Sequence, residues 1–357
     1  MNAPVVSPIC GRLALCRPGF ERECVQELEQ AARDAGLAGY ARARESGGYA
    51  EFILHDGAHA GALTAATRWN GLIFARQALD LIARLDDLDP VDRIGPLAAT
   101  LTERGERFGD LVIEHPDSDG GRELAGLARS LAPPLRVVLQ RARLLDAEAP
   151  RRLHVLLLAG DSLLLAAAVP SAAAPDAGGI PRLRFPAGAP SRSTLKLEEA
   201  LLVLLDDRER ERWLRPGMTA VDLGAAPGGW TFQLVRRALR VIAVDNGPMD
   251  RALLDSGLVE HRREDGFRFR PAKPVDWLVC DMVEQPRRIA ALMAAWLGEH
   301  RCRRALFNLK LPMKKRLAEV RLCLDLIRDA VPGVELRARQ LYHDREEITV
   351  LALPPHA

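Results

Sequence analysis

The amino-acid sequence predicts an α/β fold, with a doubly wound and largely parallel sheet in the C-terminal part and two smaller α+β domains before it. From residue 191 onward, short apolar runs alternate with helical patterns, as in strands joined by crossover helices. Residues 219–230, TAVDLGAAPGGW, have the pattern of a strand, a glycine-rich turn and a helix start. Residues 171–190 are rich in Ala, Pro and Gly, which is typical of a linker between such parts.

The first 84 residues predict a ferredoxin-like domain. Four strand-like segments occur together with two helical patterns, and their order is β-α-β-β-α-β, the order of that module. The strands are expected at 11–17, 39–44, 48–54 and 72–83, and the helices at 18–36 and 57–69.

Residues 85–170 predict a second α+β domain. A helix at 91–103 precedes a strand at 110–116. A helical stretch at 120–143 is expected to break at Pro133-Pro134, since proline lacks the N–H that a helix interior needs. A hairpin with Gly160-Asp161 at its turn closes the domain. Residues 171–190 then form the linker, and residues 191–357 form a Rossmann-like domain that ends on two adjacent strands.

The composition is that of a globular protein large enough for two or three domains. Of the 357 residues, 48% are hydrophobic and 27% are charged, which is ordinary for such proteins. No apolar run approaches the roughly 18 residues of a membrane span, and the N-terminus lacks the pattern of a signal peptide. Six cysteines without a CxxC pair or zinc spacing indicate reduced thiols in a cytosolic protein without a metal site.

Charge and lysine usage are uneven along the chain. Residues 1–180 carry 19 Lys and Arg against 24 Asp and Glu, whereas residues 181–357 carry 31 against 24. A polyanion is therefore expected to bind mainly to the C-terminal half. Only five of the 50 basic residues are lysines. Lysine, unlike arginine, is able to lose its proton inside a protein, so the positions of these lysines are informative.

The turn that follows residues 219–223 has the features of a nucleotide-binding loop. Glycines let the backbone approach a ligand, and a helix start offers free N–H groups. The spacing is not GxGxxG, and no Gly-Lys-Ser/Thr follows, so neither a dinucleotide fingerprint nor a P-loop is indicated. Asp222, two residues before Gly224, suits a cationic ligand better than a pyrophosphate.

Polar residues occur at the carboxyl ends of five expected strands, the edge where ligands bind in doubly wound sheets. These residues are Asp222, Asp245, Asp265, Asp281 and Lys310. A carboxylate after the second strand suits the two hydroxyls of a ribose, and one after the third suits an adenine. Each carboxylate alone is equally typical of a turn or a helix cap. Their common edge is what indicates a binding site.

Two further segments contribute charged residues. Ser193 is expected to cap a helix whose first turn contains Lys196, a cation that opposes the helix dipole. Glu347 directly precedes the apolar strand Ile348-Thr349-Val350 near the end of the chain.

These motifs resemble those of S-adenosylmethionine (SAM) methyltransferases. The turn is similar to motif I of that class, and APGGW is the form found in FtsJ-like ribose 2'-O-methyltransferases. Those enzymes use a Lys-Asp-Lys-Glu tetrad, which matches Lys196, Asp281, Lys310 and Glu347 in chain order. Nearly the whole chain resembles the RlmM family, as seen in PSRSTLKLEEA, AVDNGPM, EDGF, VCDM, FNLKLPMKKR and QLYHDREE. Within it, residues 85–170 resemble a THUMP domain, an RNA-binding module.

The resemblance implies a function and a set of site residues. The RlmM family uses SAM to methylate the ribose 2'-oxygen of one cytidine in the peptidyl-transferase region of 23S rRNA, in the bacterial cytoplasm. Lys310 is implied as the proton acceptor. In a variant of this turn that the resemblance brings in, a cysteine occupies the position of Ala226. The backbone of Ala226 is expected to contact the ligand equally well. The residues expected to bind SAM are Ser193, Asp222, Gly224, Ala226, Pro227, Gly228, Gly229, Asp245, Asp265 and Asp281.

Candidates for binding RNA phosphates lie close to the last parallel strand. They are Arg303, Arg304, Lys314, Lys315 and Arg316. A solvated charged face explains the three residues 314–316 equally well. A monomer without a metal and without a membrane contact is expected.

The chemistry explains why lysines and carboxylates are needed together. A ribose 2'-hydroxyl is a weak acid, so the enzyme must align it and remove its proton. A neutral lysine is able to take that proton, and a neighbouring cation and burial favour the neutral form. Lys196 supplies the cation beside Lys310, while Asp281 and Glu347 orient the two amines and oppose the loss of charge.

Other functions remain open from the sequence. An amino-directed base methyltransferase requires an Asn/Asp-Pro-Pro-Tyr/Phe segment after the fourth strand, where residues 281–286 read DMVEQP. A carbon-5 pyrimidine enzyme requires a Pro-Cys nucleophile, which is absent from the sequence. A non-catalytic rRNA-binding assembly factor would have no need for Lys310, and the glycine spacing disfavours a dehydrogenase.

Overall fold

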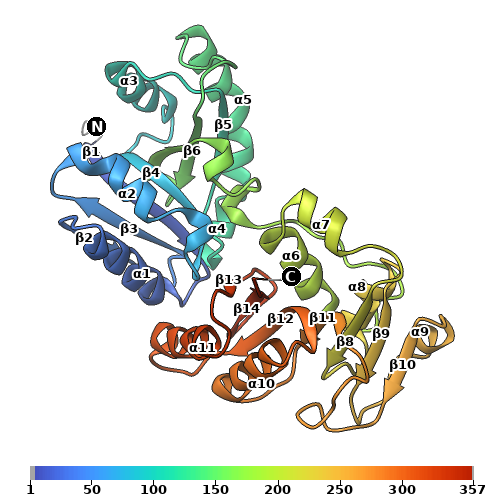
Figure 1. The fold of residues 1–357 in the computed structure, drawn as a ribbon. Coiled ribbons are helices and arrows are strands. Elements are labelled where there is room, and N and C mark those ends of the chain that lie inside the picture. The colour runs from blue at the N-terminus through green and yellow to red at the C-terminus, as the bar shows by residue number, and fades with distance from the viewer. Residues whose placement is uncertain (1–4, 356–357) are drawn as a thin grey trace. The chain divides into compact units, whose positions relative to one another are not determined.

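The computed structural model describes residues 5–355 of the chain. They form two compact units, which divide between Ile180 and Pro181. Figure 1 shows the elements of each unit as a ribbon. Each unit is built on one seven-stranded sheet with helices packed on it, so the expected α/β class is confirmed. Within the described residues, no helix is both long and apolar enough to cross a membrane.

The first half of unit 1 has the ferredoxin-like element order predicted from the sequence. Its strands lie in the order β2-β3-β1-β4 and all neighbours are antiparallel. Helix α1 packs on this sheet through Cys24, Leu28 and Ala32, which lie four residues apart and so share one face. The elements are β1 (Val5–Cys16), α1 (Glu21–Asp34), β2 (Gly39–Ala43), β3 (Tyr49–Leu54), α2 (Ala60–Ala66) and β4 (Ala75–Asp86).

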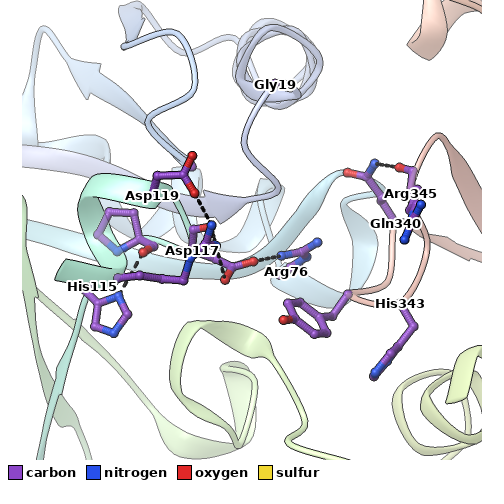
Figure 2. A network of polar contacts seen from close by, with 12 residues as sticks. Gly19, Arg76, His115, Asp117, Asp119, Gln340, His343 and Arg345 are labelled. Carbon is purple, nitrogen blue, oxygen red and sulfur yellow. Dashed lines mark hydrogen bonds and ion pairs between the residues drawn. The ribbon is translucent and has the colours of Figure 1, made fainter. Parts of the chain in front are cut away.

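The second half of unit 1 continues the same sheet. Strand β7 is hydrogen-bonded to β4, so the two halves share seven strands in the order β2-β3-β1-β4-β7-β6-β5. On β4, Arg76 Nη1 lies 3.4 Å from Asp117 Oδ2, just before α4 (Figure 2). The elements are α3 (Ile94–Arg104), β5 (Asp110–Glu114), α4 (Asp119–Glu123), α5 (Ala125–Arg141), β6 (Arg152–Leu157) and β7 (Leu163–Ala168).

Helix α5 continues through Pro133 and Pro134, where the sequence predicted a break. Ala128, Leu131, Leu135 and Leu139 on either side of the proline pair form one buried stripe against the sheet. Burial of that continuous face outweighs the roughly 3 kcal/mol by which a proline disfavours a helix interior. Short 3₁₀ turns occur at Gly57–His59, Trp69–Gly71, Pro170–Ala172 and Ala177–Gly179.

Unit 2 contains the doubly wound sheet, with strand order β10-β9-β8-β11-β12-β14-β13. The first five strands in this order are parallel, and the last two form the antiparallel hairpin expected at the end of the chain. The strands are β8 (Thr219–Leu223), β9 (Arg240–Val244), β10 (Val259–Arg262), β11 (Val275–Cys280), β12 (Cys302–Lys310), β13 (Glu335–Arg339) and β14 (Glu347–Leu353). The helices are α6 (Thr194–Leu204), α7 (Asp207–Trp213), α8 (Gly229–Val235), α9 (Arg251–Asp255), α10 (Pro286–Gly298) and α11 (Arg316–Ala330).

The strand order of unit 2 determines where a ligand binds. From β8 the chain proceeds to β9 and β10 on one side, and then returns to β11 and β12 on the other side. Such a reversal leaves a crevice outside the carboxyl ends of the two central strands. Helix α6 packs behind these strands, where Leu197 and Leu201 join a core with Trp230 and Trp277. The first turn of α6 is thereby held against the sheet.

Candidate active site

Strand ends and one strand register bring the four predicted tetrad residues together in unit 2. Asp281 directly follows β11, and Lys310 is the last residue of the neighbouring strand β12. Glu347 begins β14 and lies opposite Lys310 in the antiparallel pairing of β12 with β14. Lys196 comes from the first turn of α6. Residues far apart in the sequence therefore meet at one edge of the sheet.

Each carboxylate of this tetrad contacts both lysines. Lys196 Nζ lies 3.1 Å from Asp281 Oδ2 and 3.3 Å from Asp281 Oδ1, and it also pairs with Glu347 Oε1. Lys310 Nζ donates a hydrogen bond to Glu347 Oε2 and lies 3.7 Å from Asp281 Oδ1. The two lysines are thus held side by side with their charges balanced by two carboxylates.

The two lysines differ in exposure and in contacts. The side chain of Glu347 is only 4% exposed, whereas that of Lys310 is 28% exposed, the largest value in the tetrad. Burial lowers the pKa of Lys196, but Asp281 and Glu347 raise it further, so the pKa of Lys196 lies above its usual value. Lys196 is therefore charged at neutral pH, and Lys310 is the more exposed of the two amines.

The glycine-rich turn between β8 and α8 has no room for a side chain at Gly224, Gly228 or Gly229. Gly224 and Gly228 have φ values of +78° and +119°, a region that glycine adopts without strain. A Cβ on Gly228 would lie 2.3 Å from Leu253 Cδ1, and a Cβ on Gly229 would lie 2.1 Å from Ser193 Oγ. Ala226 and Pro227 form the outer, partly exposed part of the turn. The sequence therefore brings bare backbone to the crevice.

Asp222 lies beneath this turn and is buried. Its carboxylate accepts a hydrogen bond of 2.6 Å from Thr231 Oγ1 on α8. Burial raises the pKa of Asp222 to about 7, and the nearby carboxylates of Asp281 and Asp245 contribute to the rise. The hydrogen bond from Thr231 links the end of β8 to α8 across the turn. Because of its raised pKa, Asp222 is partly protonated near neutral pH.

The remaining predicted cofactor residues surround the same turn. Asp245, half-buried after β9, accepts hydrogen bonds from Gly247 N at 2.7 Å and Ala226 N at 3.1 Å, which leaves lone pairs for a ligand. Asp265 is exposed and accepts one bond from Phe267 N at 2.9 Å. Ser193 precedes α6 but does not cap it by a side-chain bond, because its hydroxyl pairs with that of Ser191 at 2.6 Å.

This arrangement fits a nucleoside that carries a positive charge. The glycine turn packs so closely on Met282, Leu253 and Ser193 that its glycines have no room for a side chain. The carboxylate of Asp245 suits ribose hydroxyls. The carboxylates of Asp245 and Asp281 each lie close enough to Asp222 to interact with it electrostatically, and this concentration of negative charge favours a cation. Among the described residues, no group of three or more His, Cys, Asp or Glu side chains is placed to hold a metal.

The structure separates the predicted RNA-binding residues into two groups. Arg303 and Arg304 lie at the start of β12, roughly 20 Å along the strand from Lys310. Arg304 is only 5% exposed, and its guanidinium lies over the ring of Trp213 at 4.5 Å. Its role in the structure is packing, because a cation of this kind is stabilised by indole faces. The structure therefore does not present Arg304 to a phosphate.

The second group adjoins the site. Lys314 and Lys315 are exposed in the segment directly after Lys310. Arg316 begins α11 and its Nη2 lies 3.0 Å from Glu346 Oε2, next to Glu347. These three cations lie at the same edge of the sheet as the tetrad.

Sequence reasoning missed the polar side chains that support Asp281. Asn308, fully buried in β12, donates a 2.9 Å hydrogen bond from Nδ2 to Asp281 Oδ1. Its Oδ1 is bonded to Thr349 on β14, and Thr349 is bonded to Asp344. The sequence did contain a signal for this contact: Asn308 is the one polar residue in the apolar segment Ala305–Leu309. A polar side chain buried in a strand needs a hydrogen-bonding partner.

Comparisons with known proteins find relatives over nearly the whole chain. Residues 10–79 match the RlmM ferredoxin-like domain, residues 92–168 the N-terminal domain of ribosomal RNA large subunit methyltransferase M, and residues 189–324 the FtsJ-like methyltransferase. Ribosomal RNA large subunit methyltransferase M of Xanthomonas axonopodis pv. citri (strain 306) is 55% identical over 347 residues, covering 96% of this chain and 99% of its own. Its namesake in Stenotrophomonas maltophilia (strain K279a) is 54% identical over 356 residues and 99% of both chains.

Among solved structures, TrmN from Thermus thermophilus is similar over 97% of this chain and 99% of its own, with 17% identity and a TM-score of 0.35.

The fold, the site and these matches define the class of the protein: it is an rRNA methyltransferase with an FtsJ-like catalytic domain. The chain belongs to the ribosomal RNA large subunit methyltransferase M family. The resemblance drawn from the sequence motifs is confirmed, and large-subunit rRNA is the class of substrate.

The raised pKa of Asp222 predicts a pH-dependent effect of Asp222→Asn. The folded-state pKa of about 7 exceeds the ordinary aspartate value of 3.8, so the native state holds an extra proton between about pH 4 and pH 7. Wild-type stability therefore falls as pH rises through that window. Asparagine does not titrate and still accepts a hydrogen bond from Thr231. The stability of the variant relative to wild type should therefore increase by a few kcal/mol, about 4 at most, from pH 4 to pH 7.

Urea unfolding followed by tryptophan fluorescence measures this difference. Four of the five tryptophans lie in unit 2, so the signal reports mainly on the unit that contains Asp222. Asp255→Asn, at an exposed carboxylate, is the control and should show no such trend. A stability difference for Asp222→Asn that is constant between pH 4 and pH 7 would contradict the raised pKa.

Proposed function

We propose that the protein transfers a methyl group from SAM to the ribose 2'-oxygen of a cytidine in the peptidyl-transferase region of 23S rRNA. The observation that carries the proposal is the tetrad, in which a reachable lysine lies beside a permanently charged one and shares both carboxylates with it. A methyltransferase that acts on an already nucleophilic atom needs no such group, whereas a ribose hydroxyl must lose a proton. The region and the base come from the family resemblance.

The crevice supports SAM as the methyl donor, and SAM supplies a methyl group already activated by its sulfonium. The backbone of Gly224 to Gly229 would hold the cofactor closely, and Asp245 would accept hydrogen bonds from its ribose hydroxyls. Asp265 would meet the adenine at the exposed end. Ser193 and the tetrad residue Asp281 would contact the other end of the cofactor. There the carboxylate of Asp281 would face the positive charge of the sulfonium. Asp222 keeps the turn in place from below.

The chain's own residues perform the proton transfer and the alignment. In its neutral form, Lys310 Nζ would accept the proton of the 2'-hydroxyl while that oxygen takes the methyl group, and the methyl–sulfur bond breaks to leave a neutral thioether. Lys196 remains charged and stabilises negative charge that develops on the oxygen. Glu347 and Asp281 fix the two amines, so that the exposed side of Lys310 faces the substrate.

RNA binding is assigned to both units. In unit 2, Lys314, Lys315 and Arg316 would contact phosphates beside the target nucleotide. In unit 1, we assign residues 1–84 as a ferredoxin-like domain and residues 85–170 as a THUMP-like RNA-binding domain, followed by a linker at 171–190 and the catalytic domain at 191–357. The protein would act as a monomer in the cytoplasm.

Lys310→Ala tests the reaction. With labelled SAM and protein-free 23S rRNA that lacks the modification, wild type should place label in a dinucleotide that resists alkali, because alkali does not cleave beside a 2'-O-methyl ribose. Loss of a general base should slow transfer by about 10²–10⁴-fold, so Lys310→Ala should leave the dinucleotide unlabelled. Lys273→Ala, at an exposed lysine before β11, is the matched control and should behave as wild type.

Other outcomes separate the rival functions. Label in a mononucleotide means methylation of a base and overturns the role of the tetrad. Absence of label with intact SAM binding points to a particle substrate or to an assembly factor without catalysis. Retention of the labelled dinucleotide in Lys310→Ala removes Lys310 as the proton acceptor.

The two groups of basic residues make a second prediction. Replacing Lys314 and Lys315 together by alanine should weaken RNA binding and lower the slope of log affinity against log salt by about 1 to 2, because up to two phosphate contacts are lost. Arg303→Ala at the opposite edge of the sheet should change neither. The measurement is a salt titration of RNA binding by filter retention. Equal effects of the two variants on RNA affinity and on the salt slope would contradict a phosphate-binding surface at Lys314 and Lys315.

A further inference from the structure

A row of buried polar side chains extends from the tetrad into the sheet. Asp281 Oδ1 accepts from Asn308 Nδ2 at 2.9 Å, Asn308 Oδ1 lies 2.7 Å from Thr349 Oγ1, and Thr349 Oγ1 lies 2.9 Å from Asp344 Oδ2. Asn308, Thr349 and Asp344 are each fully buried. Asn308 and Thr349 are paired across β12 and β14, so the register that brings Glu347 to Lys310 also aligns this row.

The hydrogen bonds of the row have one direction only. Asp281 contacts both lysines and, as a carboxylate, accepts hydrogen bonds without donating any. Asn308 must therefore present its NH₂ group to Asp281, and its carbonyl oxygen to Thr349. That carbonyl only accepts, so the single hydroxyl proton of Thr349 is used toward Asn308.

The proton count then reaches Asp344. Thr349 Oγ1 has no second proton to donate, so the 2.9 Å contact with Asp344 Oδ2 is a hydrogen bond only if Asp344 is the donor. A carboxylate in this position would instead face a lone pair of Thr349 in a buried environment, an unfavourable arrangement. The same oxygen accepts from Leu341 N at 3.1 Å, which the oxygen of a carboxylic acid also permits.

Burial and two neighbouring negative charges favour the same form. Burial raises the pKa of Asp344 well above its usual value, and the negative charges of Glu347 on β14 and Glu199 on α6 contribute to the rise. Glu199 is itself bonded to the backbone of Tyr342 and His343 and to His343 Nδ1. Gln340 Nε2 donates to Arg345 O at 3.1 Å (Figure 2) and closes the loop that holds Asp344.

We propose that Asp344 is a protonated positioning residue, which acts through Thr349 and Asn308 to fix the orientation of the Asp281 carboxylate. The link to catalysis rests on the proposed function. Asn308 holds Asp281 Oδ1 at 3.7 Å from Lys310 Nζ, beyond hydrogen-bond length, while Lys196 stays within 3.3 Å of both oxygens. Lys310 therefore hydrogen-bonds to Glu347 in the tetrad and keeps its remaining directions for the substrate.

Infrared spectroscopy tests the protonation without any catalytic assay. The spectrum of wild type minus Asp344→Asn near neutral pH should contain the carbonyl stretch of a buried carboxylic acid, shifted when aspartate is labelled with ¹³C. Thr349→Val removes the acceptor of that acid and should shift the band to higher frequency. A difference spectrum with carboxylate bands and no acid band overturns the proposal, even if Asp344→Asn is less stable.

Methyl transfer tests the positioning. Thr349→Val has the shape of threonine but leaves Asn308 Oδ1 without its donor, and kcat should fall by about tenfold to a hundredfold with little change in KM for SAM. Thr349→Ser keeps the hydroxyl and should restore kcat to within about threefold of wild type. A wild-type kcat in folded Thr349→Val overturns the proposal. If the label appears on a base while the acid band is present, the proposed function fails and the protonated Asp344 stands.

Discussion

The sharing of Glu347 by two lysines is the interaction on which the candidate site depends. Its two carboxylate oxygens pair with Lys196 and Lys310, and the side chain is almost completely buried. Removing either lysine would leave buried charge poorly compensated, which typically costs several kcal/mol. The antiparallel register of β12 and β14 sets one pair, and the packing of α6 on the sheet sets the other. The terminal hairpin thus assembles the site as well as closing the sheet.

The environment gives the two lysines different properties although they share their partners. Lys196 contacts both oxygens of Asp281 as well as Glu347, and these contacts outweigh the effect of burial on its pKa. Lys310 is more exposed and stands farther from Asp281. The sequence left open whether the carboxylates would outweigh burial and the neighbouring cation at Lys310; at Lys196 the carboxylates outweigh burial. An always-charged lysine beside a more exposed one supports the proposed proton transfer.

The meeting of Asp281 and Lys310 was predictable because parallel strands bring their carboxyl ends to one edge, whereas Lys196 and Glu347 were joined to them by the family resemblance. The element order of both units was predictable from hydrophobic periodicity, because helices and strands repeat their apolar residues at different intervals. Three features depended on contacts that no local pattern contains. Arg304 looked like a surface cation, but Trp213 on α7 covers it. Helix α5 tolerates Pro133 and Pro134 because its buried face continues on both sides. The role of Asn308 was not predictable, because it depends on the strand register that places Thr349 opposite it.

The measurement that tests the central claim most directly is the single-turnover rate of methyl transfer in Lys310→Arg and in Lys196→Arg. Arginine preserves the positive charge but does not accept a proton in a protein. The account predicts that Lys310→Arg loses at least about 100-fold in rate, while Lys196→Arg remains at least about tenfold faster than Lys310→Arg because its required property is charge. Equal losses in the two variants, or an active Lys310→Arg, would contradict the assignment of Lys310 as the proton acceptor.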